Sequence, residues 1–146
     1  MNIKERFLDI ATILLLYTVA TMLIFGFIDA ISGTLMPYEF TYLGQTESSI
    51  IAFDPEVWEI FSGYIRIVGY TFISFGVILV IVILFGFRKK EKWAWIVAIW
   101  GSLSLDIPFL IILATTMNLP FYLILTNLIV QVVALGISFK EFFGAK

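Results

Sequence analysis

The chain has 146 residues and a formal net charge of −2, with 61% hydrophobic and only 14% charged residues. Because soluble domains carry about 25% charged residues, this composition excludes an ordinary soluble domain and indicates an integral membrane protein. The absence of cysteine and histidine removes disulfides, the commonest metal ligands and the usual general base near neutral pH, so we expect no metal and no cofactor and favour a non-enzymatic role.

Four apolar stretches are each long enough to cross a hydrocarbon core about 30 Å thick. They cover residues 7–31, 64–87, 93–116 and 120–139. We therefore predict an all-α membrane protein, a four-transmembrane-helix antiparallel bundle, in one domain covering residues 1–146. A cleaved signal peptide is the alternative for the first stretch. Its apolar part at 10–28 exceeds the roughly 7–15 residues of a signal-peptide core, so we expect a retained span.

The segment 32–63 lies outside these spans, and its ionisable residues are all acidic. They are Glu39, Glu47, Asp54, Glu56 and Glu59. A loop without cations belongs on the extracytoplasmic face. Residues 38–42 alternate aromatic and polar side chains, and residues 49–53 are a second β-prone run. We therefore predict a small β-hairpin in this loop, supported by the helices or the lipid surface.

The motif Asp54-Pro55-Glu56 predicts the start of a helix ahead of the second span. Asp54 is suited to the N-cap, Pro55 to the first helical position and Glu56 to the positive end of the helix dipole. We expect this helix to begin above the membrane and to enter it near Tyr64.

The second and third stretches are separated by four cations within five residues. They are Arg88, Lys89, Lys90 and Lys92. Cations of this density beside hydrophobic spans stay on the cytoplasmic face. The weakly basic chain ends follow the same rule, so we predict a multi-pass protein of the cell membrane with both termini in the cytoplasm. Trp93 and Trp95 then act as anchors at the inner interface.

Asp106 is the most informative single residue. It lies about ten residues from the outer end of the third stretch, which is about 15 Å deep at 1.5 Å per residue. A carboxylate at this depth is costly and must be protonated, paired or hydrated. A functional site and a structural hydrogen bond between helices both explain it.

Small and polar residues share one face on each of the last two stretches. Ala98, Ser102 and Asp106 are spaced by four residues, and Asn127 and Gln131 repeat that spacing. With residues of similar depth on the first two spans, they predict an intramembrane polar site made of Thr21, Ser74, Ser102, Asp106, Asn127 and Gln131. This site is either a hydrogen-bonded core layer or a pocket for a polar headgroup, an ion or a proton.

Asp29 and Arg66 lie at comparable depth near the outer surface, which predicts an ion pair between them. Alternatively, Arg66 reaches the lipid phosphates or the acidic loop. Ser62, Gly69 and Gly76 repeat every seven residues on the same side of the second span, which favours close packing against a neighbouring helix.

Residues 64–69 place an arginine and a glycine at the start of the second span, and Gly76 follows. Residues 87–95 form a basic turn that leads into Trp93-Ala94-Trp95. In these features, which cover about a third of the chain, the protein resembles small four-span membrane proteins of a loosely DoxX-like kind. The resemblance implies a four-helix bundle and no particular reaction.

These features favour a small non-enzymatic membrane protein that acts by association, either as an accessory subunit of a larger assembly or as a lipid-interacting bundle. The expected partners are membrane lipid and a protein or second copy of the chain. Nucleic acid is not expected, because topology explains the basic loop. A small oligomeric transporter or channel that uses Asp106 as an ion or proton site is the second hypothesis. A membrane-embedded enzyme acting on lipid is the third.

Overall fold

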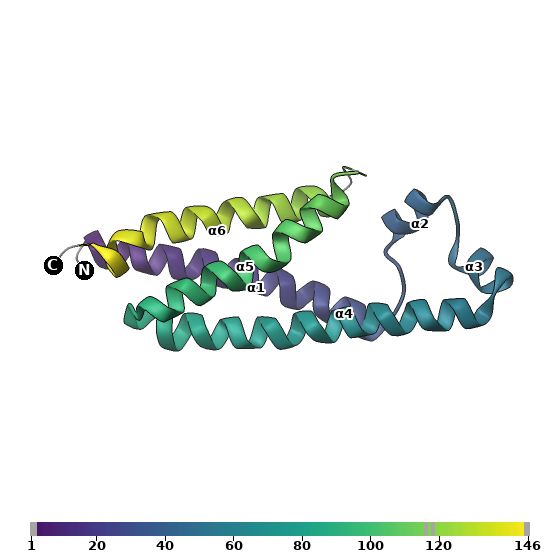
Figure 1. Cartoon of the computed structure of the whole chain (residues 1–146), viewed down its shortest axis with the longest axis horizontal. Helices are drawn as coiled ribbons and strands as arrows, with labels where there is room; N and C mark the ends of the chain where they lie inside the picture. The colour runs from purple at the N-terminus through teal and green to yellow at the C-terminus, as the bar shows by residue number, and fades with distance from the viewer. Residues whose placement is uncertain (1–2, 116, 118, 145–146) are drawn as a thin grey trace. The chain divides into compact units, whose positions relative to one another are not determined.

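The computed structural model of the chain describes residues 3–115, 117 and 119–144, except for the side chains of residues 3–5, 38, 42 and 102. The described residues form helices joined by short connections, and they contain no strand (Figure 1). Four of the described helices are long and apolar enough to cross a membrane. They are α1 (Ile3–Ser32), α4 (Pro55–Ile81), α5 (Lys92–Leu113) and α6 (Leu119–Phe143). The predicted all-α architecture with four candidate spans is thus confirmed.

Helix α4 continues through a π-helical turn at Val82–Gly86 and a 3₁₀ turn at Phe87–Lys89. The helical run Pro55–Lys89 has 35 residues, which corresponds to about 50 Å at 1.5 Å per residue. This length exceeds a hydrocarbon core of about 30 Å, so the run is longer than a single span requires. Helix α4 begins at Pro55, as predicted, and Asp54 caps it by accepting hydrogen bonds from the backbone N–H groups of Glu56 at 2.9 Å and Val57 at 3.3 Å.

The predicted β-hairpin is wrong, because both of its strands are short helices. The first is α2 (Pro37–Leu43). Pro37 occupies a first-turn position, and the Glu39 carboxylate accepts a hydrogen bond of 2.7 Å from the backbone N–H of Met36. Gly44 ends the helix in the left-handed conformation, with a φ of 62°. These contacts satisfy both ends of the helix locally.

The second short helix is α3 (Glu47–Phe53). The Thr46 hydroxyl accepts from the Ser49 backbone N–H at 3.2 Å, and the Ser49 hydroxyl accepts from the Thr46 backbone N–H at 2.9 Å. This reciprocal capping box stabilises a helix without any partner. Two isolated strands would have been marginal, so capping outweighs the alternation of side chains in this segment.

The exposed side chains of the four long helices are largely apolar. Ile13 on α1, Ile67 on α4, Ile111 on α5 and Val132 on α6 are all more than half exposed. Water would disfavour such surfaces, whereas lipid hydrocarbon matches them. These side chains therefore suit helices that face lipid.

Two compact units make up the chain. The first consists of residues 1–21 and 75–146, and the second consists of residues 22–74. Helices α1 and α4 contribute residues to both units.

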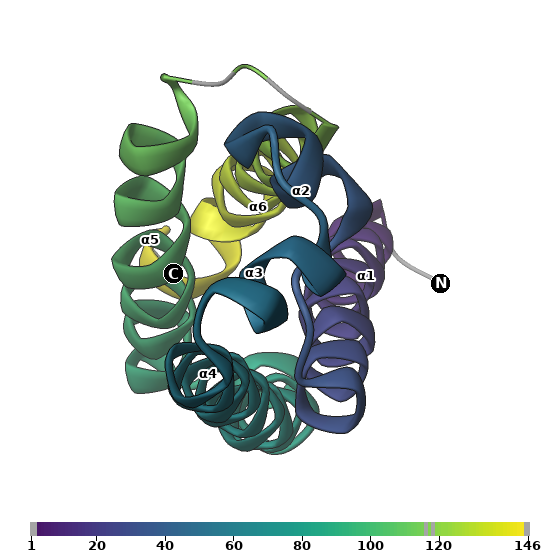
Figure 2. The same ribbon diagram turned by 90° about the vertical axis from the view of Figure 1, so that its right-hand side faces the viewer.

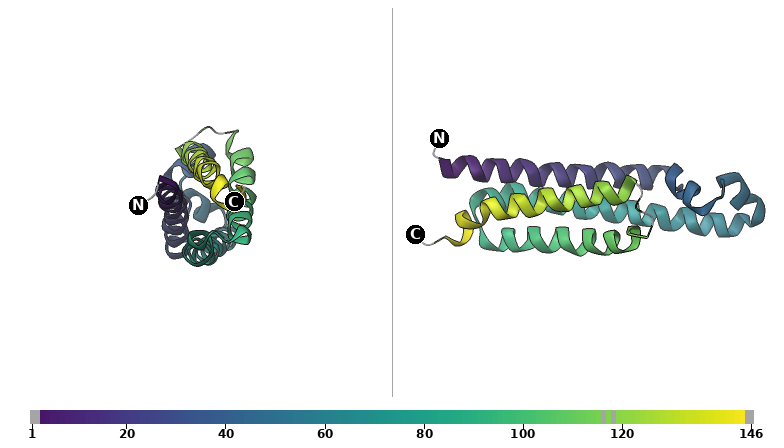
Figure 3. Two further views of the ribbon diagram at one scale, coloured as in Figure 1. Left: turned by 90° about the vertical axis from the view of Figure 1, so that its left-hand side faces the viewer. Right: turned by 90° about the horizontal axis from the view of Figure 1, so that it is seen from above.

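In the first unit, end-on views place α6 between α1 and α5, and the last part of α4 beside α5 (Figure 2, Figure 3). Small side chains fill the contacts: Ala11, Ala94, Ala98, Ala134 and Ser138 are at most 2% exposed. Ala98 therefore faces inward, as the seam on the third span predicts. The start of α1, the α4–α5 turn and the end of α6 lie at one end of this unit (Figure 1), which is consistent with the predicted topology.

In the second unit, α1 and α4 approach each other closely at glycine. A Cβ atom added at Gly69 would lie 2.7 Å from the Gly26 carbonyl oxygen and closer still to the Ala30 backbone nitrogen. The expectation that Gly69 packs against a neighbour is confirmed. On α1 the contact is made by Gly26 and Ala30, two small residues at i and i+4. This spacing is a known pattern for close helix contact, and it was not among the predicted packing sites.

Replacing Gly69 by alanine should destabilise the protein by about 1–3 kcal/mol, because the new methyl group has no room between the helices. The same change at Gly63 should be neutral or stabilising. An added Cβ there meets no atom within 4 Å, and alanine favours a helix over glycine by up to about 1 kcal/mol. Thermal unfolding in detergent compares the two variants, and equal losses of stability would contradict the close packing.

Candidate functional site

The polar layer of the first unit is built around α6. Asp106 lies on α5, seven residues before its end at Leu113, and the side-chain amide of Gln131 on α6 lies within hydrogen-bonding reach of its carboxyl group. Asp106 Oδ2 and Gln131 Oε1 are both buried and have no hydrogen-bond partner among the described residues. Two acceptor atoms without a donor are therefore enclosed at neighbouring positions.

One turn earlier, α6 is joined to α1. The Asn127 side-chain amide donates a hydrogen bond of 2.7 Å to the Thr21 hydroxyl. That hydroxyl donates in turn to the Thr18 carbonyl oxygen, also at 2.7 Å. Asn127 and Gln131 are four residues apart and share one side of the helix, so α6 uses successive turns to contact α1 and α5.

Four of the six residues predicted for the polar site thus form two adjacent contacts. Ser74 belongs to the second unit, where its hydroxyl donates to the Tyr70 carbonyl oxygen of its own helix at 2.8 Å. The side chain of Ser102 lies outside the described part of the chain. In the geometry that is described, the layer connects helices through hydrogen bonds.

The predicted ion pair between Asp29 and Arg66 is not formed between these two described side chains. The Arg66 guanidinium instead donates to three backbone carbonyl oxygens at the end of α1. They belong to Ala30 at 3.2 Å, Ile31 at 3.1 Å and Ser32 at 3.3 Å. The last carbonyls of a helix lack intrahelical partners and carry the negative end of its dipole, so the planar fork of arginine caps this terminus.

A groove of about 420 Å³ lies between α5 and α6 in the first unit. Among the side chains that the structure describes, its lining is almost entirely apolar, and Gln131 is the polar member. The lining residues are Trp95, Ile99, Leu103, Gln131, Val132, Leu135, Gly136 and Phe139. The volume falls within the roughly 300–1,000 Å³ of small-molecule sites in proteins.

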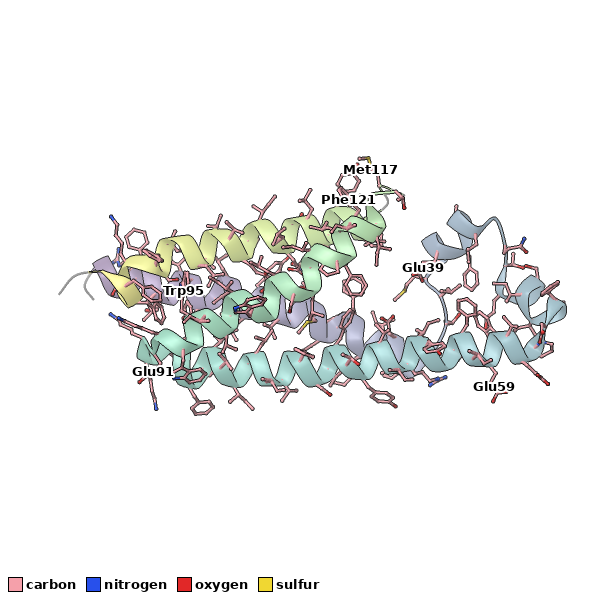
Figure 4. All side chains as sticks on the ribbon, viewed as in Figure 1. Glu39, Glu59, Glu91, Trp95, Met117 and Phe121 are labelled. Carbon is pink, nitrogen blue, oxygen red and sulfur yellow. The ribbon has the colours of Figure 1, made fainter. Side chains whose placement is uncertain are left out.

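Trp95 forms the wall of the groove nearest the α4–α5 turn, on the side of α5 that meets α6 (Figure 4). Its indole N–H donates to the Leu135 carbonyl oxygen and to the Ser138 hydroxyl, each at 3.3 Å. Its ring packs edge-on against Phe139 and Phe143, with centroid distances of 5.5 and 5.1 Å. The predicted interfacial anchor is therefore also a fixed part of the groove.

Basic side chains gather at the same end of the unit. Lys90 forms an ion pair of 2.7 Å with Glu141 on α6, and the Lys92 ammonium lies 5.5 Å from the centroid of the Phe143 ring. Arg88 and Lys89, which are predicted to keep this loop on the cytoplasmic face, are exposed in the turn.

The sequence reading did not identify the groove. Two features of the sequence point to it: Gly136, which leaves space on α6, and the phenylalanines between Phe139 and Phe143. On α6 the lining residues Leu135 and Phe139 continue the four-residue spacing of Asn127 and Gln131, so the groove follows the same side of the helix with apolar side chains.

The hydrogen bond between Asn127 and Thr21 should show measurable coupling in a double-mutant cycle of Thr21→Val and Asn127→Leu. Hydrogen bonds between membrane helices average about 0.6 kcal/mol and reach about 1.7 kcal/mol, so we expect a coupling in this range from unfolding in detergent. The pair Thr12→Val and Asn127→Leu is the control, because Thr12 bonds only to the Leu8 carbonyl of its own helix. Coupling in the control cycle, or none in the first, would contradict a direct contact.

Comparison of the chain with known proteins found no matching family model, no matching curated protein and no matching solved structure. The resemblance to DoxX-like proteins therefore stays a prediction, and the function has to be inferred from the geometry alone.

Proposed function

We propose that the protein is a non-enzymatic, lipid-interacting bundle of the cell membrane that holds a lipid acyl chain in the groove between α5 and α6. Its basic loop and both termini face the cytoplasm in this proposal, as the distribution of lysine and arginine favours. The groove is the observation that carries the proposal, because its apolar lining has the chemistry of a hydrocarbon ligand.

The dimensions of the groove suit one acyl chain. Trp95 and Leu103 mark its extent along α5, and eight residues of helix correspond to about 12 Å. One leaflet of a hydrocarbon core about 30 Å thick has a depth of about 15 Å. The groove therefore covers most of the depth of the leaflet next to the α4–α5 turn, and an acyl chain of that leaflet can lie along it.

A helix of a partner protein fits this space less well. A helix about 10 Å in diameter occupies roughly 900 Å³ over a length of 12 Å, about twice the volume of the groove. A partner helix would enter only partway, whereas a thinner hydrocarbon chain can lie along the groove against its apolar lining. An empty groove would forfeit the dispersion contacts of its lining, so occupancy by a lipid chain is favoured.

Filling the groove should remove the bound lipid. An added Cβ at Gly136 meets no atom within 4 Å, so Gly136→Leu can place its side chain in the groove without disturbing the backbone. We expect native mass spectrometry in mild detergent to show lipid retained by the unmodified protein and at least a severalfold loss in this variant.

Gly63→Leu is the matched control, since Gly63 also has free space around its Cβ position and lies in the second unit. Lipid retention should be unchanged there. Equal retention in Gly136→Leu and the unmodified protein would overturn the proposal, as would equal loss in both leucine variants.

One observation favours a second candidate function, a small oligomeric transporter or channel. The unpartnered acceptors Asp106 Oδ2 and Gln131 Oε1 offer a place for a proton or a cation in the middle of a span. Asp106→Asn would supply an N–H donor to Gln131 and remove the charge, so it should keep the fold. If transport is the function, this variant should lose at least tenfold of the proton or Na⁺ flux in proteoliposomes.

Asp9→Asn is the control for this measurement, because Asp9 is an exposed acid on α1. It should leave any flux unchanged. Flux that survives Asp106→Asn, or its absence from the unmodified protein, would exclude a transport role for Asp106 and leave the carboxyl group as a contact between helices.

A further inference from the structure

We infer that the lipid in the α5–α6 groove is an anionic phospholipid whose phosphate is bound by Lys92 and Lys140. This inference rests on the proposed function and adds the class of headgroup. Both lysines are exposed. Each lies just beyond the lining residues of one groove wall, on the side of the α4–α5 turn.

Lys140 extends the α6 wall. Gly136 lines the groove, and Lys140 lies four residues further along the helix, one turn away on the same face. A lysine at this position can lay its alkyl chain along the helix while its ammonium stays at headgroup level. It also lies in the last turn of α6, where a cation complements the dipole.

Lys92 extends the α5 wall, three residues before Trp95 on the same face. Its ammonium lies 5.5 Å from the centroid of the Phe143 ring. That ring contacts two groove residues, Trp95 and Phe139, at centroid distances of 5.1 Å each. The positive charge of Lys92 therefore lies directly beside the aromatic side chains that close this end of the groove.

One acid at this end of the unit, Glu141, is already paired and does not compete for the two lysines. Glu141 follows Lys140 in sequence, but its carboxylate is paired with Lys90 at 2.7 Å, and only 11% of its side chain is exposed. Glu91 precedes α5 and is exposed in the turn (Figure 4). The ion pair of Lys90 with Glu141 leaves Lys92 and Lys140 as cations next to an apolar groove, the arrangement that complements a phosphate attached to acyl chains.

Topology alone accounts for cations at this end, and it applies equally to Arg88 and Lys89. Those two residues provide the control, because they lie in the turn Phe87–Lys89, whereas Lys92 and Lys140 lie on α5 and α6, the two helices that form the groove. A general surface attraction would depend on all four cations alike. A bound phosphate would depend on Lys92 and Lys140.

The test reconstitutes the full chain in vesicles of equimolar phosphatidylglycerol and phosphatidylcholine with identical palmitoyl and oleoyl chains. Native mass spectrometry after mild extraction then measures the ratio of the two lipids on the protein. One lysine near an anionic lipid raises the affinity for that lipid over a neutral one by roughly fivefold. The unmodified protein should therefore retain clearly more phosphatidylglycerol than phosphatidylcholine. The preference should fall as ionic strength rises.

The double variant Lys92→Gln/Lys140→Gln should bring the ratio close to one while lipid stays bound, because the groove is intact. Lys92→Arg/Lys140→Arg should keep the preference. Arg88→Gln/Lys89→Gln, which removes the same charge, should also keep it.

The outcomes separate the two proposals. Lipid bound without a headgroup preference, or an equal loss of preference in the control, overturns the anionic-lipid inference and leaves the acyl-chain proposal standing. No lipid retained by the unmodified protein overturns both.

Discussion

A hydrocarbon core offers no water to polar groups, so a chain with helices long and apolar enough to cross it is under a demand to satisfy those groups internally. Helices satisfy this demand for the backbone, and α6 satisfies much of it for side chains. Asn127 bonds to Thr21 on α1, and Gln131 reaches Asp106 on α5. The position of α6 between its two neighbours (Figure 2) makes two amides on successive turns sufficient to join three helices.

The same helix carries two surfaces of different chemistry. Its polar side chains hold the first unit together, and its apolar face, opened by Gly136, forms a groove with α5. Trp95 connects these roles, since its indole N–H is bonded to α6 while its ring lines the groove. A wall held in this way would preorganise the groove for the proposed acyl chain, because the Trp95 ring is already fixed by its contacts with α6.

Charged side chains have different roles in the two units. In the second unit, Arg66 caps the carbonyls at the end of α1, while Glu39 and Asp54 cap the starts of α2 and α4. Acidic side chains of segment 32–63 therefore lie at the starts of helices, where the helix dipole favours anions. In the first unit, by contrast, no described acid forms an ion pair with Lys92 or Lys140, and the proposed binding of a phosphate depends on this difference.

Hydropathy, capping and helical period are local properties, so the residues alone were enough to predict the number of long helices, the start of α4 at Pro55 and the inward face of Ala98. It also placed Thr21, Asp106, Asn127 and Gln131 in one layer, since depth follows from counting residues. The hairpin prediction failed where two local signals competed and reciprocal capping was overlooked. Only the tertiary structure decided that Arg66 contacts carbonyls and not Asp29, and that Trp95, Gly136 and Phe139 share a groove. Those contacts depend on how each helix is rotated about its axis and on which rotamers its long side chains adopt, and neither is encoded in residue spacing.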